Sequence, residues 1–122
     1  MSTHSLSKNV EDSVLKNDVM MEIRERIVRG FLDFFVLVKL SEGCEPLGGY
    51  DFGKLVTEEF DVALSPGSIY GVLYSMERDG LIQAISQRKK RAYELTDKGE
   101  TKVKNVSEEK EKVLYLFGSL FV

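Results

Sequence analysis

The stretch SPGSIYGVLYSMERDGLI, from Ser65 to Ile82, decides the fold of this chain. It begins with Ser-Pro, a strong helix-start signal, because a serine side chain can cap free backbone amides and proline suits the first helical position. Gly80 near its end is a natural left-handed terminator. Between them, apolar residues recur at helical spacing and form one inward face: Ile69, Val72, Leu73 and Met76. We therefore predict a helix from Pro66 to about Asp79.

Two short strands are predicted to follow this helix. The segments LIQAIS and RAYEL have the composition of strands, and in the second Tyr93 and Leu95 point inward while Glu94 points outward. Gln87 to Lys90 then form the tip of a hairpin. The basic cluster SQRKKR, Ser86 to Arg91, therefore lies on a turn that projects from the body.

The segments on either side of this unit are predicted to be helical. Apolar residues from Met20 to Val38 recur every three or four positions, which indicates a first helix ending near Leu40. Three glycines and a proline mark residues 41–49 as a loop, and YDFGKLVTEEF follows it as a second helix. At the other end, Thr96 is placed to cap a helix that runs nearly to the C-terminus.

The order helix, helix, helix, hairpin, helix is that of a winged helix-turn-helix, in which the third helix enters the major groove of DNA. The predicted fold is therefore mainly α with a small β-hairpin. Residues 19–96 would form the winged helix-turn-helix DNA-binding domain, and residues 97–122 a C-terminal dimerisation helix. Residues 1–18 are polar and show no clear periodicity, so we expect a mobile N-terminal arm.

From about Arg29 to Gly99 the chain resembles the PadR-type transcriptional regulators. Three motifs carry the resemblance, in matching order and spacing: Gly49-Tyr50 after the apolar first helix, the stretch SPGSIYGVLYSMERDGLI, and the exit from the wing, YELTDKG. The last motif is shared with MarR-type and other winged-helix regulators. The resemblance implies a DNA-binding regulator, usually a repressor, that dimerises through its first and last helices.

The charge of the chain is unevenly distributed. The whole chain has 17 basic and 20 acidic residues, a formal charge of −3 that by itself argues against a polyanionic partner. Residues 27–85 carry four basic and nine acidic groups, whereas residues 86–96 carry four basic groups and one acidic group. An acidic body with one basic wing would bind DNA in a single orientation, with a steep loss of affinity in salt.

The candidate DNA contacts come from the second helix, the third helix and the wing. Gly67 and Ser68 are small, so the third helix can bring its free amides and dipole close to a phosphate. The hydroxyl of Tyr70 could reach the DNA backbone from the helix edge, whereas Tyr50 is expected to be a packing residue. The other candidates are free polar or basic side chains: Ser65, Tyr74, Ser75, Lys54, Arg88, Lys89, Lys90 and Arg91.

The recognition helix carries no arginine or asparagine on its free face, so no bidentate contact to a base is available there. Sequence readout would then depend partly on DNA shape, or specificity would be low. The same uncharged face leaves an alternative open: a winged-helix protein-interaction module that has lost DNA binding.

The predicted last helix has an apolar stripe that three helices and a hairpin cannot cover. An exposed stripe is a liability, and the simplest cover is a symmetric homodimer, which would bind a pseudo-palindromic site. The phenylalanines could also line a pocket for a small aromatic effector, although core packing is the favoured interpretation. The predicted dimerisation residues are Phe31, Phe34, Phe35, Val106, Val113, Leu116, Phe117, Leu120 and Phe121.

Other classes of function find little support in the composition. One cysteine, Cys44, and one histidine, His4, are too few for a metal cluster, an intramolecular disulfide or a catalytic triad, so we predict neither a cofactor nor an enzyme. The most apolar run, Phe31 to Leu40, is about half as long as a membrane-spanning helix. We therefore expect a cytoplasmic protein without a membrane partner.

Overall fold

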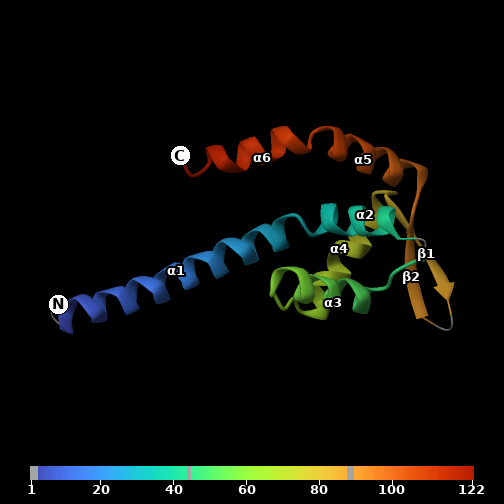
Figure 1. Cartoon of the computed structure of the whole chain (residues 1–122). Coiled ribbons are helices and arrows are strands. Elements are labelled where there is room, and N and C mark those ends of the chain that lie inside the picture. The colour runs from blue at the N-terminus through green and yellow to red at the C-terminus, as the bar shows by residue number, and fades with distance from the viewer. Residues whose placement is uncertain (1–2, 44, 88–89) are drawn as a thin grey trace.

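Six helices and one β-hairpin make up the described part of the chain (Figure 1). The computed structural model describes the backbone of residues 3–43, 45–87 and 90–122, and the side chains of these ranges from Val14 onward except Gln87. The order is the predicted one, with the first and last helices each divided in two. The elements are α1 (Thr3–Gly30), α2 (Leu32–Glu42), α3 (Gly49–Phe60), α4 (Pro66–Arg78), β1 (Ile82–Gln87), β2 (Lys90–Leu95), α5 (Asp97–Glu108) and α6 (Lys110–Ser119).

The hydrophobic core lies where α2, α3 and α4 meet the hairpin. Each of these helices contributes a side chain with no exposed surface, namely Val36, Phe52 and Leu73, and β2 adds Tyr93. On α4 the predicted inward face is confirmed, with three residues buried and Val72 partly buried against the core: Ile69, Leu73 and Met76. The other face of α4 is therefore free for a partner.

The hairpin is attached to the body by a third backbone segment. β1 and β2 pair antiparallel along their whole length, from Ile82 opposite Leu95 outward. The loop before α3 adds a bridge to β2: the Leu47 amide donates to the Tyr93 carbonyl at 3.3 Å, and the Tyr93 amide donates back at 2.9 Å. Residues 88 and 89 of the predicted tip lie outside the described residues.

The first helix bends at Gly30 and Phe31. The sequence predicts one helix from Met20 to near Leu40, and this is wrong at the bend, where Phe31 has φ −122° and ψ 19°. Glycine has a low helix propensity and is a common site of kinks. Backbone hydrogen bonds still cross the bend, including one of 2.9 Å from the Phe31 amide to the Ile27 carbonyl. The chain therefore changes direction without a loop.

Helix α1 reaches much further toward the N-terminus than the sequence analysis predicts. The sequence shows no clear periodicity over residues 1–18 and a mobile arm is expected there, but the chain is helical from Thr3 onward. No glycine or proline occurs before Gly30 to stop a helix, and apolar residues repeat at i, i+4 spacing: Leu6, Val10 and Val14. Figure 1 shows α1 extending away from the core, with the N-terminus at its far end.

The last helix starts as predicted and is then interrupted at Glu109. The Thr96 hydroxyl caps α5 by accepting the Gly99 amide at 3.1 Å. At Glu109, φ is −97° and ψ is 5°, and the amide is shared between two carbonyls, those of Asn105 and Val106, at 3.2 Å each. A shared hydrogen bond of this kind tightens one turn. Helix α6 therefore leaves α5 at an angle (Figure 1).

Gly99→Ala should destabilise the fold, because the first turn of α5 packs directly on the backbone of Leu81. A Cβ at position 99 would overlap the Leu81 carbonyl oxygen and come within 3.0 Å of Leu95. We expect the free energy of unfolding to fall by about 2 kcal/mol or more, measured by urea denaturation.

Gly71→Ala provides the matched control for this variant. Gly71 is also a helical glycine, but nothing lies within 4 Å of the position its Cβ would take. It should therefore stabilise the protein by about 0.5–1 kcal/mol. Similar denaturation midpoints for the two variants would contradict the close packing of α5 on Leu81.

Candidate nucleic-acid interface

The N-terminus of α4 is open to solvent and carries its predicted cap. The Ser65 hydroxyl accepts the Ser68 amide at 3.2 Å and lies 2.9 Å from the Ser68 hydroxyl. Ser65, Pro66 and Gly67 are exposed. Unpaired amides and the helix dipole make such an end suitable for a phosphate. The start of α4 is therefore accessible as the sequence analysis predicts.

Two tyrosines follow on the same face of α4. Tyr70 and Tyr74 are four residues apart, and their rings stack with centroids 6.1 Å apart and planes 30° apart. Tyr70 is 37% exposed and Tyr74 is 54% exposed. The Tyr70 ring lies against α3, because a Cβ at Gly49 would come within 2.6 Å of it. A glycine at position 49 is thus what lets this tyrosine lie close to α3.

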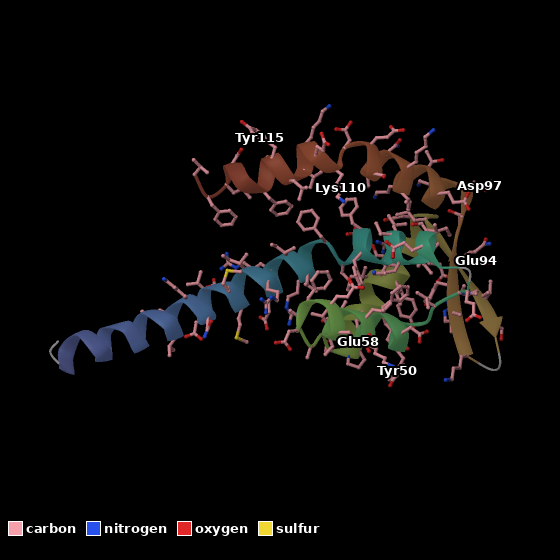
Figure 2. The ribbon with its side chains drawn as sticks, viewed as in Figure 1. Tyr50, Glu58, Glu94, Asp97, Lys110 and Tyr115 are labelled. Carbon is pink, nitrogen blue, oxygen red and sulfur yellow. The ribbon has the colours of Figure 1, made fainter. Side chains whose placement is uncertain are left out.

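Tyr50 also belongs to this surface, and its predicted packing role is wrong. Its side chain is 80% exposed and projects from the first turn of α3 (Figure 2). A hollow of about 460 Å³ joins it to three other candidate residues, namely Tyr70, Lys90 and Arg91. The pair Gly49-Tyr50 is the sequence signal that could have indicated the exposed position of Tyr50. Gly49 must stay small because it lies beneath the Tyr70 ring. The starts of α3 and β2 and one face of α4 therefore share a single hollow.

The hollow is of mixed charge. Besides Lys90 and Arg91, it is lined by the acidic residues Glu45 and Asp51. The Asp51 carboxylate is already engaged, because it accepts the Gly48 amide at 2.8 Å and so caps the start of α3. The hollow therefore carries less positive charge than the basic residues of the wing alone would give it.

Arg91 is bound within the protein. One guanidinium nitrogen, Nη2, donates to both carboxylate oxygens of Glu77 at 2.8 and 3.1 Å, and Nε donates to the Tyr93 hydroxyl at 3.0 Å. The guanidinium carbon also lies 5.9 Å from the centroid of the Tyr74 ring. The hydrogen bond to Tyr93, followed by that to Glu77, raises the pKa of Arg91. Arg91 therefore connects the wing to α4.

The remaining candidates differ in how free they are. Lys90 is exposed, and the Lys54 amine lies 4.0 Å from the Glu58 carboxylate on the outer side of α3. The Ser75 hydroxyl accepts a 3.2 Å hydrogen bond from Arg78. The predicted contacts Arg88 and Lys89 lie outside the described residues, as does Cys44.

The predicted dimerisation residues separate into two groups. The rings of Phe31 and Phe117 meet edge to face at 5.3 Å and so bring α6 against the bend after α1. Phe34 lies beneath the Lys102 amine, and Phe35 packs on Phe60 at 5.3 Å, so both have partners in the same chain. Val106 is half-buried. Phe31 is exposed despite this contact, and the other exposed members lie on α6 or just after it: Val113, Leu116, Leu120 and Phe121.

Within residues 3–43, 45–87 and 90–122, no cluster of three or more histidine, cysteine, aspartate or glutamate residues could hold a metal ion. Among these residues, no helix has both the length and the apolar character needed to cross a membrane.

A helix with a capped, open start, α4, preceded by α2 and α3 and followed by a two-stranded wing, defines a winged helix-turn-helix protein. The sequence model of the transcriptional regulator PadR-like family matches residues 36–105. The chain therefore belongs to the PadR-like family of transcriptional regulators. No curated protein matched the chain.

Solved structures of regulators share this fold. A PadR-like transcriptional regulator from Bacillus cereus is 24% identical with a TM-score of 0.67, over 78% of this chain and 95% of the other. A protein assigned as a transcriptional regulator from Thermoplasma acidophilum is 26% identical with a TM-score of 0.65, over 78% and 94%. A winged-helix DNA-binding protein from STIV is 20% identical with a TM-score of 0.57, over 66% and 87%.

Ser65→Ala should weaken the start of the recognition helix. The variant removes the acceptor of the Ser68 amide, and the loss of such a cap costs about 1 kcal/mol of unfolding free energy. Chemical denaturation of the two proteins would measure the difference. Ser107→Ala, at an exposed position inside α5, is the control and should be neutral or slightly stabilising. A neutral Ser65→Ala would contradict the capping role.

Proposed function

We propose that the chain is a homodimeric repressor that binds a pseudo-palindromic operator and blocks transcription from the promoter that contains it. The observation that carries this proposal is the shared hollow lined by Tyr50, Tyr70 and Lys90, together with the open, capped start of α4. Membership of the PadR-like family supports DNA binding in general. The operator, the homodimer and repression are the finer part of the proposal.

In this proposal α4 enters the major groove and offers its N-terminal amides to a phosphate. Tyr50 and Tyr70 contact the sugar-phosphate backbone beside the groove, and Lys90 holds a phosphate beyond it. Tyr74 and Ser75 lie further along α4 and contact base edges. Because these side chains offer few bidentate contacts, much of the sequence preference would come from the shape of the DNA.

The homodimer is supported by apolar surface on two elements. On α1 the exposed large apolar side chains include Val19 and Met20, and on α6 and the residues after it they include Leu116 and Phe121. Contiguous apolar surface of this kind normally belongs to an interface. Pairing α1 and α6 with those of a second copy would cover both and set two α4 helices toward successive major grooves.

A small aromatic effector is a further part of the proposal. Phe31 and Phe117 border a hollow of about 240 Å³ between α1 and α6, and Arg26 lies at its edge. A planar ligand seated there would contact the same apolar residues as the proposed dimer interface. Its binding would therefore change how the two recognition helices are spaced.

DNA binding can be tested by titrating the protein into a labelled fragment from upstream of its own gene at several salt concentrations. If about four phosphates per subunit of a dimer are neutralised, log K should fall against log salt with a slope of roughly −7. Replacing Arg88, Lys89 and Lys90 together by glutamine should reduce the slope strongly. Absence of wild-type binding even at low salt would contradict the proposal and favour a protein-interaction module.

A second triple variant is the matched control for charge. Replacing Lys104, Lys110 and Lys112 by glutamine removes the same charge from exposed positions on α5 and α6. Figure 2 shows Lys110 on the C-terminal helices, on the opposite side of the molecule from Tyr50. This variant should keep the wild-type salt slope to within about one unit. An equal effect of the two variants would indicate nonspecific electrostatic binding.

The homodimer can be tested with Leu116→Glu combined with Phe121→Glu. Two charges on an apolar interface should shift sedimentation from dimer to monomer and reduce operator affinity by at least about tenfold, because the subunits then bind singly. Thr101→Glu adds a charge to an exposed position on α5 and should remain dimeric. A wild-type protein that sediments as a monomer would contradict this part of the proposal.

A further inference from the structure

The acidic residue Glu77 continues the DNA-facing stripe of α4. Tyr70, Tyr74 and Glu77 are spaced four and three residues apart, so they lie on one side of the helix. A carboxylate in that position is unfavourable twice, because it lies at the C-terminal end of the helix dipole and on the side that faces a polyanion. Its neutralisation therefore matters for any contact with DNA.

Arg91 supplies that neutralisation from the wing. The Glu77 side chain is 31% exposed and that of Arg91 is 52% exposed, so the pair is only partly screened by water. Both carboxylate oxygens accept hydrogen bonds from the guanidinium, which leaves little of the Arg91 charge for a phosphate. The pair is also directional, because Nε is held by the hydroxyl of the fully buried Tyr93.

The outer half of the hairpin depends on this contact. Its base is held by the Leu47 bridge to Tyr93, but further out the residues of β2 are exposed, and an isolated two-stranded ribbon is only marginally stable. Arg91 lies opposite Ser86, two residues beyond the bridge, and reaches across to α4. Among the described residues, this ion pair links the outer part of the wing to the recognition helix.

We propose that Arg91 is a positioning residue, which clamps the wing to α4 through Glu77 and Tyr93 and so sets Lys90 at the right distance from the DNA backbone. This inference rests on the proposed DNA binding. It replaces the predicted role of Arg91 as a phosphate contact. It also assigns Glu77, an acidic residue on a DNA-facing stripe, a part in binding DNA.

Two single variants distinguish a clamp from a phosphate contact. Glu77→Ala removes an acid from the DNA side, so a phosphate-binding Arg91 would then bind DNA more tightly, whereas a broken clamp would bind about tenfold more weakly. Arg91→Lys keeps the charge but loses the planar fork and the bond to Tyr93. A clamp predicts weaker binding of about the same size, and a phosphate contact predicts near-normal binding.

The double variant and one control complete the binding experiment. Glu77→Ala with Arg91→Lys should bind no more weakly than the weaker single variant, because both break one interaction. Glu94→Ala is the control, because it also removes an acid from the hairpin. The Glu94 carboxylate accepts a 2.6 Å hydrogen bond from Gln83 of β1, and the variant should leave DNA affinity unchanged. Unchanged or tighter binding by Glu77→Ala, or additive losses in the double variant, would overturn the proposal.

Amide hydrogen exchange in the free protein tests the clamp without DNA. Glu77→Ala should speed exchange of the ladder amides beyond the base, such as those of the paired residues Ile85 and Ala92, by about tenfold relative to the Tyr93 amide, which bonds to Leu47. Unchanged exchange would overturn the clamp. Faster exchange together with a wild-type protein that binds no DNA would instead refute the proposed function while leaving the clamp in place.

Discussion

Tyr93, whose side chain is buried, is the constraint on which the proposed DNA-binding surface depends. Its backbone pairs in both directions with Leu47, which holds β2 against the loop that leads into α3. Its ring is fully buried in the core, and its hydroxyl accepts a hydrogen bond from Arg91, which in turn binds Glu77 of α4. One residue, through its backbone and its side chain, thus connects the loop, the wing and α4. The hollow lined by all three follows from that link.

The electrostatics of the chain make sense only at the level of individual pairs. The net charge of −3 describes an acidic body that would repel a polyanion. The basic residues of the wing give it a local positive charge. Because Arg91 is paired with Glu77, the wing would attract DNA less strongly than its composition suggests. In the proposed function, the remaining attraction comes from Lys90 and the other basic residues of the wing. Binding that depends on these cations is sensitive both to salt and to where the wing is held.

Local signals in the sequence predicted the elements of the domain well. Ser65 caps α4, Gly80 adopts the left-handed conformation with φ 78°, and Thr96 caps α5, each as expected from the residue type. These features depend on a few adjacent residues, so periodicity and capping rules capture them. The bend at Phe31 and the interruption at Glu109 were missed. Whether a helix continues or breaks at such a point depends on what it packs against in the folded protein.

The sequence by itself determined the order of helices and strands, the buried face of α4 and the family, because each depends on spacing along one segment. Only the tertiary structure decided that Tyr50 is exposed beside the hollow and that Arg91 pairs with Glu77, fourteen residues away on another element. Both outcomes depend on how β2, α3 and α4 are placed around Tyr93. Residue type and spacing carry no information about such contacts, because they form between segments that meet only when the core is packed.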